Sequence, residues 1–174
     1  SALGAMLEGE LYVDETISDE GRFMLVTNVE SQAPKCWISE GQRYKHQSQT
    51  IIQGLSNSCN YFFYTLGYRL GETRLYQYAS EFGLTSKTGI DLPGEAATIM
   101  HKKENMKLVE LATVSFGQSF QITPVQLVTT AASIINGGNR VTPHFGIRAE
   151  SADGQSVKVF EYPVREGVVS EETS

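Results

Sequence analysis

The chain of 174 residues has 40% hydrophobic and 20% charged residues, which is typical of a folded globular protein and not of a disordered one. Its net charge of −6 and the absence of a basic patch disfavour nucleic acid as a partner. The longest apolar runs are far shorter than a bilayer span and none of the sequence looks like a signal peptide, so we expect a soluble piece, or one separated from its targeting and anchoring segments.

The first third of the chain carries only short structural signals. Residues 2–8 look like the tail of a helix with Gly9 as its stop. Residues 10–45 are irregular in pattern, with a short strand-like run at residues 22–26. A short helix is expected over residues 48–56, with Ile51, Ile52 and Leu55 facing inward.

From residue 60 onward the patterns are stronger. Helical spacing of apolar residues predicts a buried helix interrupted at Gly71 and a second one over about residues 73–82. Residues 84–107 indicate a long loop. Thr123-Pro124-Val125-Gln126 predicts a capped helix start, because Thr caps, Pro suits the first turn and Gln completes a capping box. Alternation around residues 152–154 predicts a β-hairpin, and residues 170–173 resemble the first turn of a helix. The inward face of the capped helix is expected to hold Leu127, Val128, Ala131, Ala132 and Ile135.

A polar cluster, Ser58-Cys59-Asn60, directly precedes the longest apolar helical pattern. A Ser-x-Asn at that position suits catalysis, because the hydroxyl can pass a proton and the carboxamide can hold a substrate carbonyl. The alternative is a simple helix cap, since Ser and Asn are favoured at the N-cap. The rest of the chain favours the catalytic interpretation.

Other chemistry-bearing residues show no recognised spacing. Cys36 and Cys59 do not form a C-x-x-C pair, which argues against a metal knuckle or a thioredoxin motif. The histidines, His46, His101 and His144, are scattered, and each is expected to be a surface or packing residue. The two cysteines either form a disulfide or remain buried free thiols. The sequence contains no recognised metal-binding or phosphate-binding spacing.

Six segments, in this order and spacing, together resemble the transpeptidase domain of class B penicillin-binding proteins. The loop TGIDLPGE and the run FGQ…TPVQL are the most specific of them. The six are residues 58–63 (SCNYFF), 82–84 (FGL), 88–95 (TGIDLPGE), 115–118 (SFGQ), 123–127 (TPVQL) and 132–138 (ASIINGG).

The resemblance implies an α+β fold of the β-lactamase and DD-transpeptidase type, with this chain supplying mainly the helical subdomain plus a β-hairpin. Residues 1–174 are expected to be a fragment of a single transpeptidase domain, truncated at both ends. The family carries three motifs, S-x-x-K, S-x-N and K-T-G. Only the second is found, as Ser58-Cys59-Asn60. Lys87-Thr88-Gly89 spells the third but falls in the TGIDLPGE loop, and we expect it to be structural.

The implied activity is peptidoglycan cross-linking by a serine acyl-enzyme formed on the D-Ala-D-Ala end of a stem peptide. By resemblance, Ser58 relays a proton toward the leaving amine and Asn60 holds an amide carbonyl of substrate or β-lactam. The implied partners are stem peptides, β-lactam antibiotics and other cell-wall synthesis proteins. The parent protein would lie at the extracytoplasmic face of the cell membrane, held by an anchor absent from this chain, and the chain alone would be inactive.

Two other functions stay open at this point. One is a penicillin-recognising hydrolase, either a carboxypeptidase or a β-lactamase-like enzyme. The other is a non-catalytic β-lactam sensor or interaction domain. The TGIDLPGE and TPVQL segments favour the transpeptidase.

Overall fold

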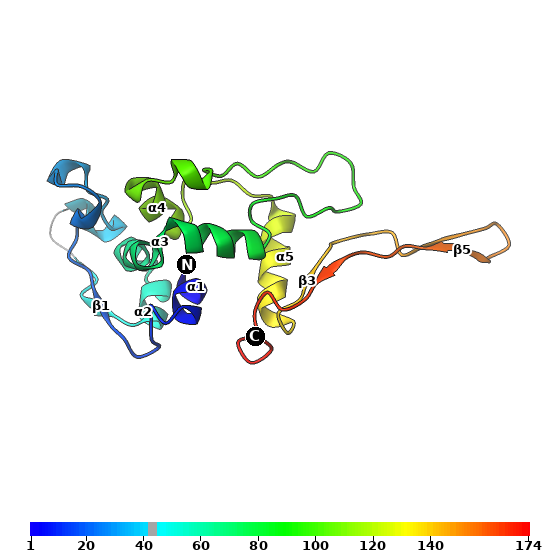
Figure 1. Cartoon of the computed structure of the whole chain (residues 1–174), viewed down its shortest axis with the longest axis horizontal. Helices are drawn as coiled ribbons and strands as arrows, with labels where there is room; N and C mark the ends of the chain where they lie inside the picture. Colours follow the sequence, from blue (N-terminus) through cyan, green and yellow to red (C-terminus); the bar gives the residue numbers. More distant parts are fainter. Residues whose placement is uncertain (42–44) are drawn as a thin grey trace. The chain divides into compact units, whose positions relative to one another are not determined.

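The computed structural model describes residues 1–41 and 45–174 of the chain. It divides into two compact units, one made of Ser1–Tyr78 and His101–Phe120 and the other of Ala79–Met100 and Gln121–Ser174 (Figure 1). No helix of the described residues is both long and apolar enough to cross a bilayer. Residues 42–44 of the stretch predicted to be irregular lie outside the described residues.

The first unit is mainly helical. Its regular elements are α1 (Ala2–Leu7), β1 (Ile17–Ser18), three 3₁₀ turns (Met24–Val26, Glu30–Gln32, Trp37–Gly41), β2 (Ser48–Gln49), α2 (Ile51–Ser56), α3 (Asn60–Glu81, which continues into the second unit), a fourth 3₁₀ turn (Lys103–Asn105) and α4 (Leu108–Ser115). The strands β1 and β2 pair antiparallel, with Ile17 opposite Gln49. The predicted strand at residues 22–26 is wrong, because that segment forms one bridge at Arg22 and then a 3₁₀ turn.

The core of this unit lies around the first half of α3. Phe62, Leu66 and Leu70 are buried, as the helical spacing predicted. The backbone leaves helical geometry at Gly71, whose φ is 75°, which confirms the predicted interruption. Phe62 and Leu66 pack in one cluster with five other buried residues, namely Ala5, Leu11, Ile17, Cys36 and Cys59.

The inward face predicted for residues 48–56 is only partly correct. Ile51 packs against the core, but Ile52 and Leu55 are exposed. The buried row of α2 is Ile51 and Gly54, where Gly54 lies against the ring of Phe62. A helix of six residues can bury one such row, and the close approach at Gly54 fixes which one.

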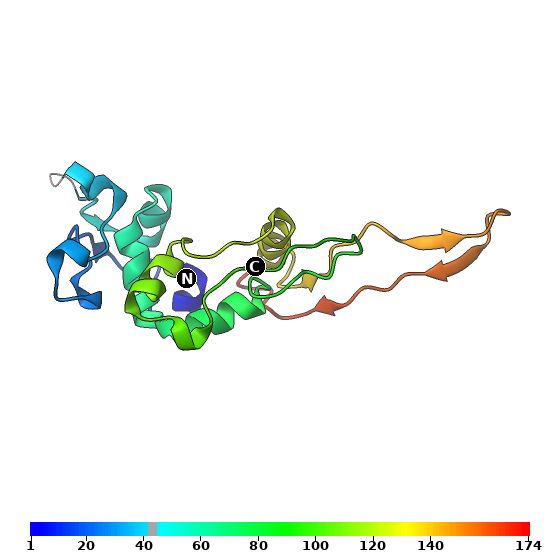
Figure 2. The same ribbon diagram turned by 90° about the horizontal axis from the view of Figure 1, so that it is seen from above.

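The second unit holds the end of α3, a long loop, α5 (Pro124–Ile135) and the strands β3 (Arg140–Val141), β4 (Arg148–Glu150), β5 (Ser156–Val159) and β6 (Val164–Arg165). The strands pair as β3 with β6 and β4 with β5, and Gly154 turns the chain between β4 and β5 with a φ of 81°. Figure 2 shows β4 and β5 as the two sides of one hairpin, which confirms its prediction.

The start of α5 is as predicted, but its buried face is not. The Thr123 hydroxyl accepts a hydrogen bond from the Gln126 amide at 3.2 Å, and the Gln126 side chain accepts one from the Thr123 amide at 2.8 Å. However, the buried row consists of the polar residues Gln126, Thr129 and Ser133. Four of the residues predicted to face inward are exposed (Leu127, Val128, Ala131, Ile135) and Ala132 is half-buried.

Within the polar row of α5, Gln126 binds the long loop, whereas the Thr129 and Ser133 hydroxyls donate to backbone carbonyls of α5 itself. The Gln126 carboxamide donates to the Ser86 carbonyl and to the Thr98 hydroxyl, both at 2.6 Å. The Thr130 hydroxyl donates to the Phe82 carbonyl at 2.8 Å. Buried loop backbone requires such partners, and only polar side chains of the helix can supply them.

Four helices end in the same hydrogen-bond pattern. At α1, for example, Gly9 N–H donates to the Met6 carbonyl and Glu10 N–H to the Ala5 carbonyl, which is a Schellman motif. The ends of α3 and α4 repeat it with Gly83 and Gly117 in the left-handed position. At α2 the same position is held by Ser58, with a φ of 48°.

Close helix packing predicts that Gly67→Ala destabilises the first unit. A Cβ on Gly67 would overlap Ser115 Oγ and lie 2.6 Å from Ser115 Cβ. We expect a loss of about 1–3 kcal/mol in the free energy of unfolding, measured by urea denaturation, although alanine is the better helix former. In a Ser115→Gly background the same change should cost clearly less. An equal cost in both backgrounds would contradict this packing.

The left-handed backbone at Ser58 predicts that Ser58→Gly does not destabilise the protein. Removing the Cβ relieves about 1–2 kcal/mol of left-handed strain and adds about 0.5–1 kcal/mol of unfolded-state entropy. The free energy of unfolding should therefore stay constant or rise by about 1 kcal/mol. Ser56→Gly, in the last helical residue of α2, is the matched control and should lower stability. A loss for Ser58→Gly as large as the control's would refute the strain.

Candidate active site

The Ser-x-Asn cluster lies at the junction between α2 and α3. Ser58 N–H donates to the Leu55 carbonyl at 3.1 Å and Cys59 N–H to the Gly54 carbonyl at 2.9 Å, so the backbone of this junction is fixed by α2. Within the described part of the chain, the Ser58 hydroxyl makes no hydrogen bond. Backbone strain of this kind clusters at functional sites.

The cap of α3 is Cys59, and not the serine or the asparagine beside it. Cys59 Sγ accepts a hydrogen bond from Phe62 N–H at 3.4 Å, three residues along, which is the geometry of an N-cap. Asn60 is the first residue of the helix. The structure thus removes the alternative in which Ser58 serves as the helix cap.

Ser58 and Asn60 line one open pocket of about 310 Å³. One turn along α3, the Tyr64 hydroxyl donates to the Lys35 carbonyl at 3.2 Å, and burial raises the pKa of Tyr64 to about 12. The structure therefore brings both predicted site residues to a single concave surface. The pocket is completed by Leu55 from α2, Phe63 from α3, and Ser115 and Phe116 at the end of α4.

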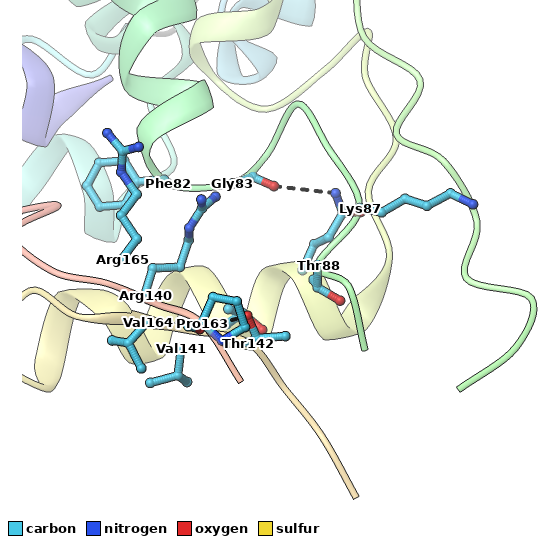
Figure 3. Close-up of a pocket in the computed structure, with 12 residues that line it drawn as sticks. Phe82, Gly83, Lys87, Thr88, Arg140, Val141, Thr142, Pro163, Val164 and Arg165 are labelled. Carbon is cyan, nitrogen blue, oxygen red and sulfur yellow. Dashed lines mark hydrogen bonds between the residues drawn. The ribbon is translucent and has the colours of Figure 1, made fainter. Parts of the chain in front are cut away.

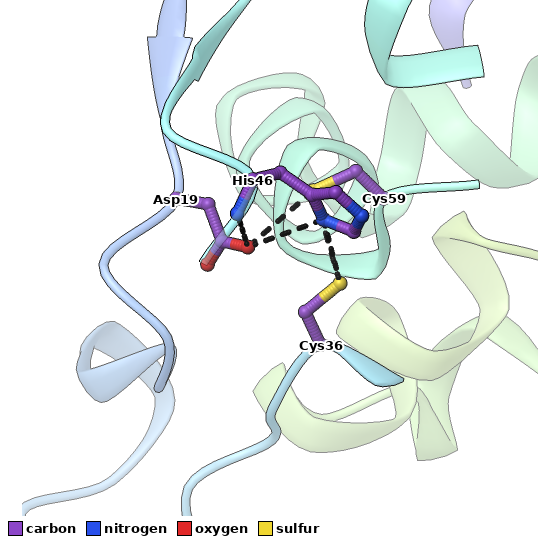
Figure 4. A group of neighbouring side chains, drawn as sticks. All are labelled: Asp19, Cys36, His46 and Cys59. Atoms are coloured by element: carbon purple, nitrogen blue, oxygen red, sulfur yellow. Dashed lines mark hydrogen bonds and ion pairs between the residues drawn. The ribbon is translucent and has the colours of Figure 1, made fainter. Parts of the chain in front are cut away.

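Cys36 and Cys59 are buried free thiols in the structure. Their sulfur atoms lie 3.9 Å apart, and burial raises the pKa of Cys59 to about 12. Figure 4 shows that Asp19 and His46 surround the same point. The His46 side chain is only 7% exposed, so it is not the surface residue that the sequence allowed.

Sequence reasoning missed this four-residue group because its members come from separate segments. Asp19 follows β1, Cys36 precedes a 3₁₀ turn, His46 precedes β2 and Cys59 precedes α3. The antiparallel pairing of β1 with β2 brings Asp19 beside His46, whose N–H donates to the Asp19 carboxylate at 3.2 Å. Only that long-range pairing, which the residue spacing does not reveal, could have indicated the group.

The Lys87-Thr88-Gly89 tripeptide lies in a loop without regular secondary structure. The Glu95 carboxylate closes this loop by accepting hydrogen bonds from Thr88 N–H at 2.6 Å, from the Thr88 hydroxyl at 2.7 Å and from Gly89 N–H at 3.1 Å. Burial acts to raise the pKa of Glu95, but these hydrogen bonds lower it overall. Thr88 and Gly89 of the tripeptide thus take part in closing this loop, and the tripeptide does not lie on a strand.

Asp91 of the same loop holds the segment before β4. Its carboxylate accepts hydrogen bonds from the backbone N–H groups of Gly146 and Phe145 and from the Tyr162 hydroxyl, at 2.7, 3.0 and 2.9 Å. The bonds from Gly146 and then Phe145 lower the pKa of Asp91. The residues of the TGIDLPGE segment that carry charge therefore have structural partners.

A second pocket, of about 150 Å³, lies in the second unit beside this loop (Figure 3). Its charged residues are Lys87, Arg140 and Arg165, and Arg165 pairs with Glu81. Figure 3 shows the Lys87 side chain extending away from Arg140 and Arg165. Arg140 packs against Gly83, where a Cβ would clash with it. These contacts join the end of α3 to β3, and we assign this pocket a structural role.

Comparison with known proteins shows which family the chain resembles. The family model for the penicillin binding protein transpeptidase domain matches residues 1–174. Stage V sporulation protein D of Bacillus subtilis is 38% identical over 141 residues, which cover 80% of this chain and 21% of that protein. Peptidoglycan D,D-transpeptidase MrdA of Acinetobacter baumannii is 31% identical over 152 residues, covering 82% of this chain and 22% of the relative. The chain thus spans about a fifth of the length of these relatives.

Solved structures show the same fold. Penicillin binding protein 3 from Mycobacterium tuberculosis, complexed with aztreonam, superposes with a TM-score of 0.82 at 24% identity, covering 99% of this chain and 36% of that one. Pseudomonas aeruginosa PBP2 in complex with WCK 5153 superposes with a TM-score of 0.74 at 26% identity, and the match covers 92% of this chain and 37% of the PBP2 chain. These matches confirm the predicted α+β fold of the transpeptidase type. With the family model covering every residue, the chain belongs to the penicillin-binding protein transpeptidase domain family, as its class B resemblance predicted.

Proposed function

We propose that the protein containing this chain is a peptidoglycan D,D-transpeptidase that cross-links stem peptides through a serine acyl-enzyme and also binds β-lactams. The observation that carries the proposal is the Ser58 hydroxyl, unengaged on a left-handed backbone and sharing a pocket with Asn60. The names of the relatives, which include peptidoglycan D,D-transpeptidases, support the same activity. All 174 residues would belong to one transpeptidase domain, since one family model spans them.

In the proposed mechanism Ser58 relays a proton. When a nucleophilic serine attacks the D-Ala-D-Ala carbonyl, the leaving amine must gain a proton, and a hydroxyl can donate one while it accepts another. The left-handed backbone at Ser58 sets the position of this hydroxyl at the pocket, and a glycine at this position would supply no hydroxyl. The Asn60 carboxamide would donate a hydrogen bond to an amide carbonyl of the stem peptide or the β-lactam.

The alternative enzyme is a penicillin-recognising hydrolase, in which water replaces the second stem-peptide amine as acceptor. The TGIDLPGE and TPVQL segments favour the transpeptidase over that hydrolase and over a non-catalytic β-lactam sensor. We further propose that the parent protein acts at the extracytoplasmic face of the cell membrane and works with other cell-wall synthesis proteins. Its stem-peptide substrate is found at that face.

The proposed role of Ser58 predicts that variants at this position fold normally but are acylated slowly. Ser58→Gly and Ser58→Ala in the full-length protein should each slow acylation by a fluorescent penicillin by about 10²-fold or more, because the proton relay is lost. The rate of covalent labelling measures this, and the free energy of unfolding of Ser58→Gly shows that the fold is retained. Acylation by Ser58→Gly at the wild-type rate would overturn the assigned role.

A substitution at Lys87 tests whether the Lys87-Thr88-Gly89 tripeptide takes part in catalysis. Lys87→Ala in the full-length protein should leave the acylation rate unchanged within a few-fold, because Lys87 lies in a loop closed by Glu95. The same labelling assay measures it. A loss as large as that of Ser58→Ala would mean that Lys87 acts in catalysis.

The 174-residue chain alone should form no covalent adduct with penicillin. It contains no S-x-x-K, and without a nucleophile the covalent step has no acceptor for the acyl group. Intact-mass measurement after incubation with penicillin checks this, with the full-length protein as positive control. A stoichiometric adduct on the chain would show that another residue serves as nucleophile.

A further inference from the structure

The peptide group between Asn57 and Ser58 is hydrogen-bonded at both of its polar ends. Its N–H, which belongs to Ser58, donates to the Leu55 carbonyl at 3.1 Å. Its C=O, which belongs to Asn57, accepts a hydrogen bond from the indole Nε1–H of Trp37 at 3.2 Å. Among the described residues, Trp37 supplies the one hydrogen bond to this carbonyl. Trp37 lies 20 residues earlier in the chain, so this contact joins a separate segment to the Ser-x-Asn junction.

The orientation of this peptide group decides the backbone conformation of Ser58. Turning a peptide plane over changes ψ of the residue before it and φ of the residue after it together, which is the difference between type I and type II turns. Asn57 has a ψ of −1° and Ser58 a φ of 48°. In the turned-over peptide, φ of Ser58 would be negative and its N–H would lose the Leu55 carbonyl. The Asn57 carbonyl would also point away from the indole, so the Trp37 hydrogen bond exists only while Ser58 is left-handed.

The residue type at position 58 by itself favours the turned-over peptide. A residue with a Cβ is strained in the left-handed region, whereas glycine is not. At the ends of α1, α3 and α4 this position is held by glycine, which needs no further contact to stay left-handed. The strain of one left-handed serine and the net stabilisation from one neutral hydrogen bond are similar in size. The Trp37 contact is therefore strong enough to affect which orientation is populated.

Trp37 is held in place by its own surroundings. It is the first residue of a 3₁₀ turn and follows the fully buried Cys36. Its ring packs against that of His46, with ring centroids 5.4 Å apart and ring planes at 62°. Trp37 is nevertheless 55% exposed, so burial of apolar surface stabilises it less than a tryptophan in a core. The property that distinguishes it from a phenylalanine at this position is its N–H donor.

A second contact fixes Asn57 independently of Trp37. The Asn57 side chain donates from Nδ2 to Gln49 Oε1 at 2.7 Å, and Gln49 is 2% exposed. Gln49 lies in β2 and is paired there with Ile17 of β1. The backbone N–H of Asn57 donates to the Gln53 carbonyl of α2 at 2.9 Å. Loss of the Trp37 hydrogen bond is therefore expected to release the peptide plane and to leave Asn57 itself in place.

We propose that Trp37 is a positioning residue for Ser58. Its indole N–H holds the Asn57–Ser58 peptide in the orientation that keeps Ser58 left-handed, and this orientation sets the Ser58 hydroxyl at the pocket that Asn60 also lines. Trp37 is not among the described residues that line this pocket, so it acts on the reaction through the junction. The effect on acylation rests on the proposed function, whereas the effect on the peptide orientation does not.

The first test compares acylation by a fluorescent penicillin in the full-length protein and in its Trp37→Phe variant, which keeps an aromatic ring without the N–H. We expect the first-order acylation rate constant to fall about 3- to 10-fold, the effect of one lost neutral hydrogen bond. The dissociation constant of the initial non-covalent complex should change by less than about twofold, because no group that lines the pocket is removed. Tyr12→Phe, at another exposed aromatic residue, is the matched control and should keep the wild-type rate.

A Ser58→Ala background separates positioning from general damage to the fold. If Trp37 acts through the Ser58 hydroxyl, Trp37→Phe should slow acylation no further once that hydroxyl is absent, because the effects of coupled residues are not additive. With Ser58→Ala slow, an equal slowing by Trp37→Phe in both backgrounds would overturn the proposal, and so would a wild-type rate for Trp37→Phe alone.

Amide hydrogen exchange gives a readout that does not depend on activity. In Trp37→Phe the Ser58 N–H should exchange with solvent at least several-fold faster than in the wild type, because the turned-over peptide breaks its hydrogen bond to the Leu55 carbonyl. The Gly9 N–H at the end of α1 should exchange at an unchanged rate. Unchanged exchange at Ser58 would overturn the positioning role. Faster exchange together with wild-type acylation by Ser58→Ala would support that role and count against the proposed function alone.

A non-natural amino acid keeps the test decisive if Trp37→Phe fails to fold. Benzothienylalanine at position 37 has the shape of tryptophan with sulfur in place of the indole N–H, so it removes the donor alone. We expect the same slow acylation and the same fast exchange at Ser58 with this residue. Wild-type exchange at Ser58 in that protein would overturn the proposal.

Discussion

The start of α3 is the constraint on which the first unit depends. The end of α2 and the start of α3 share residues 57–60, with a Schellman motif on one side and the Cys59 cap on the other. Two helix ends that meet within four residues leave almost no backbone freedom between them. The buried cluster of Phe62 and Leu66 follows at once, so the position of the helix end also sets the core.

The same constraint explains why a serine occupies a position that glycine fills elsewhere in this chain. Gly9, Gly83 and Gly117 take the left-handed position at the ends of α1, α3 and α4 with no steric cost. Ser58 has a Cβ and is therefore strained in this conformation, but its hydroxyl lies at a fixed place on the pocket that Asn60 also lines. Strain of this kind persists when the surroundings over-determine the backbone, which the two helix ends do here.

Local signals in the sequence predicted much of the fold. The capping box at Thr123, the break at Gly71 and the hairpin turn at Gly154 each depend on residues close in sequence. The structural predictions that were wrong concern segments whose conformation depends on residues distant in the sequence. Gln126 of α5 is buried because it donates hydrogen bonds to Ser86 and Thr98 of the distant loop. The segment after Arg22 pairs too briefly to become a strand.

The candidate site could be proposed from a sequence motif, but its geometry could not be predicted. Ser-x-Asn and its flanking segments identified Ser58 and Asn60, because the family pattern is carried by neighbouring residues. The left-handed backbone at Ser58 follows from where α2 ends, which the sequence does not specify. The convergence of Asp19 and His46 on two cysteines depends on the pairing of two-residue strands, and strands so short leave almost no pattern.

We propose that the Ser58–Asn60 junction is a rigid catalytic element. The most direct measurement is a crystal structure of the full-length protein acylated by a penicillin, at a resolution that defines the backbone at residues 57–60. We expect a positive φ at Ser58, and an Asn60 side chain about 3 Å from the amide carbonyl of the bound penicillin. A Ser58 hydroxyl that caps α3, or a penicillin bound without contact to either residue, would contradict it.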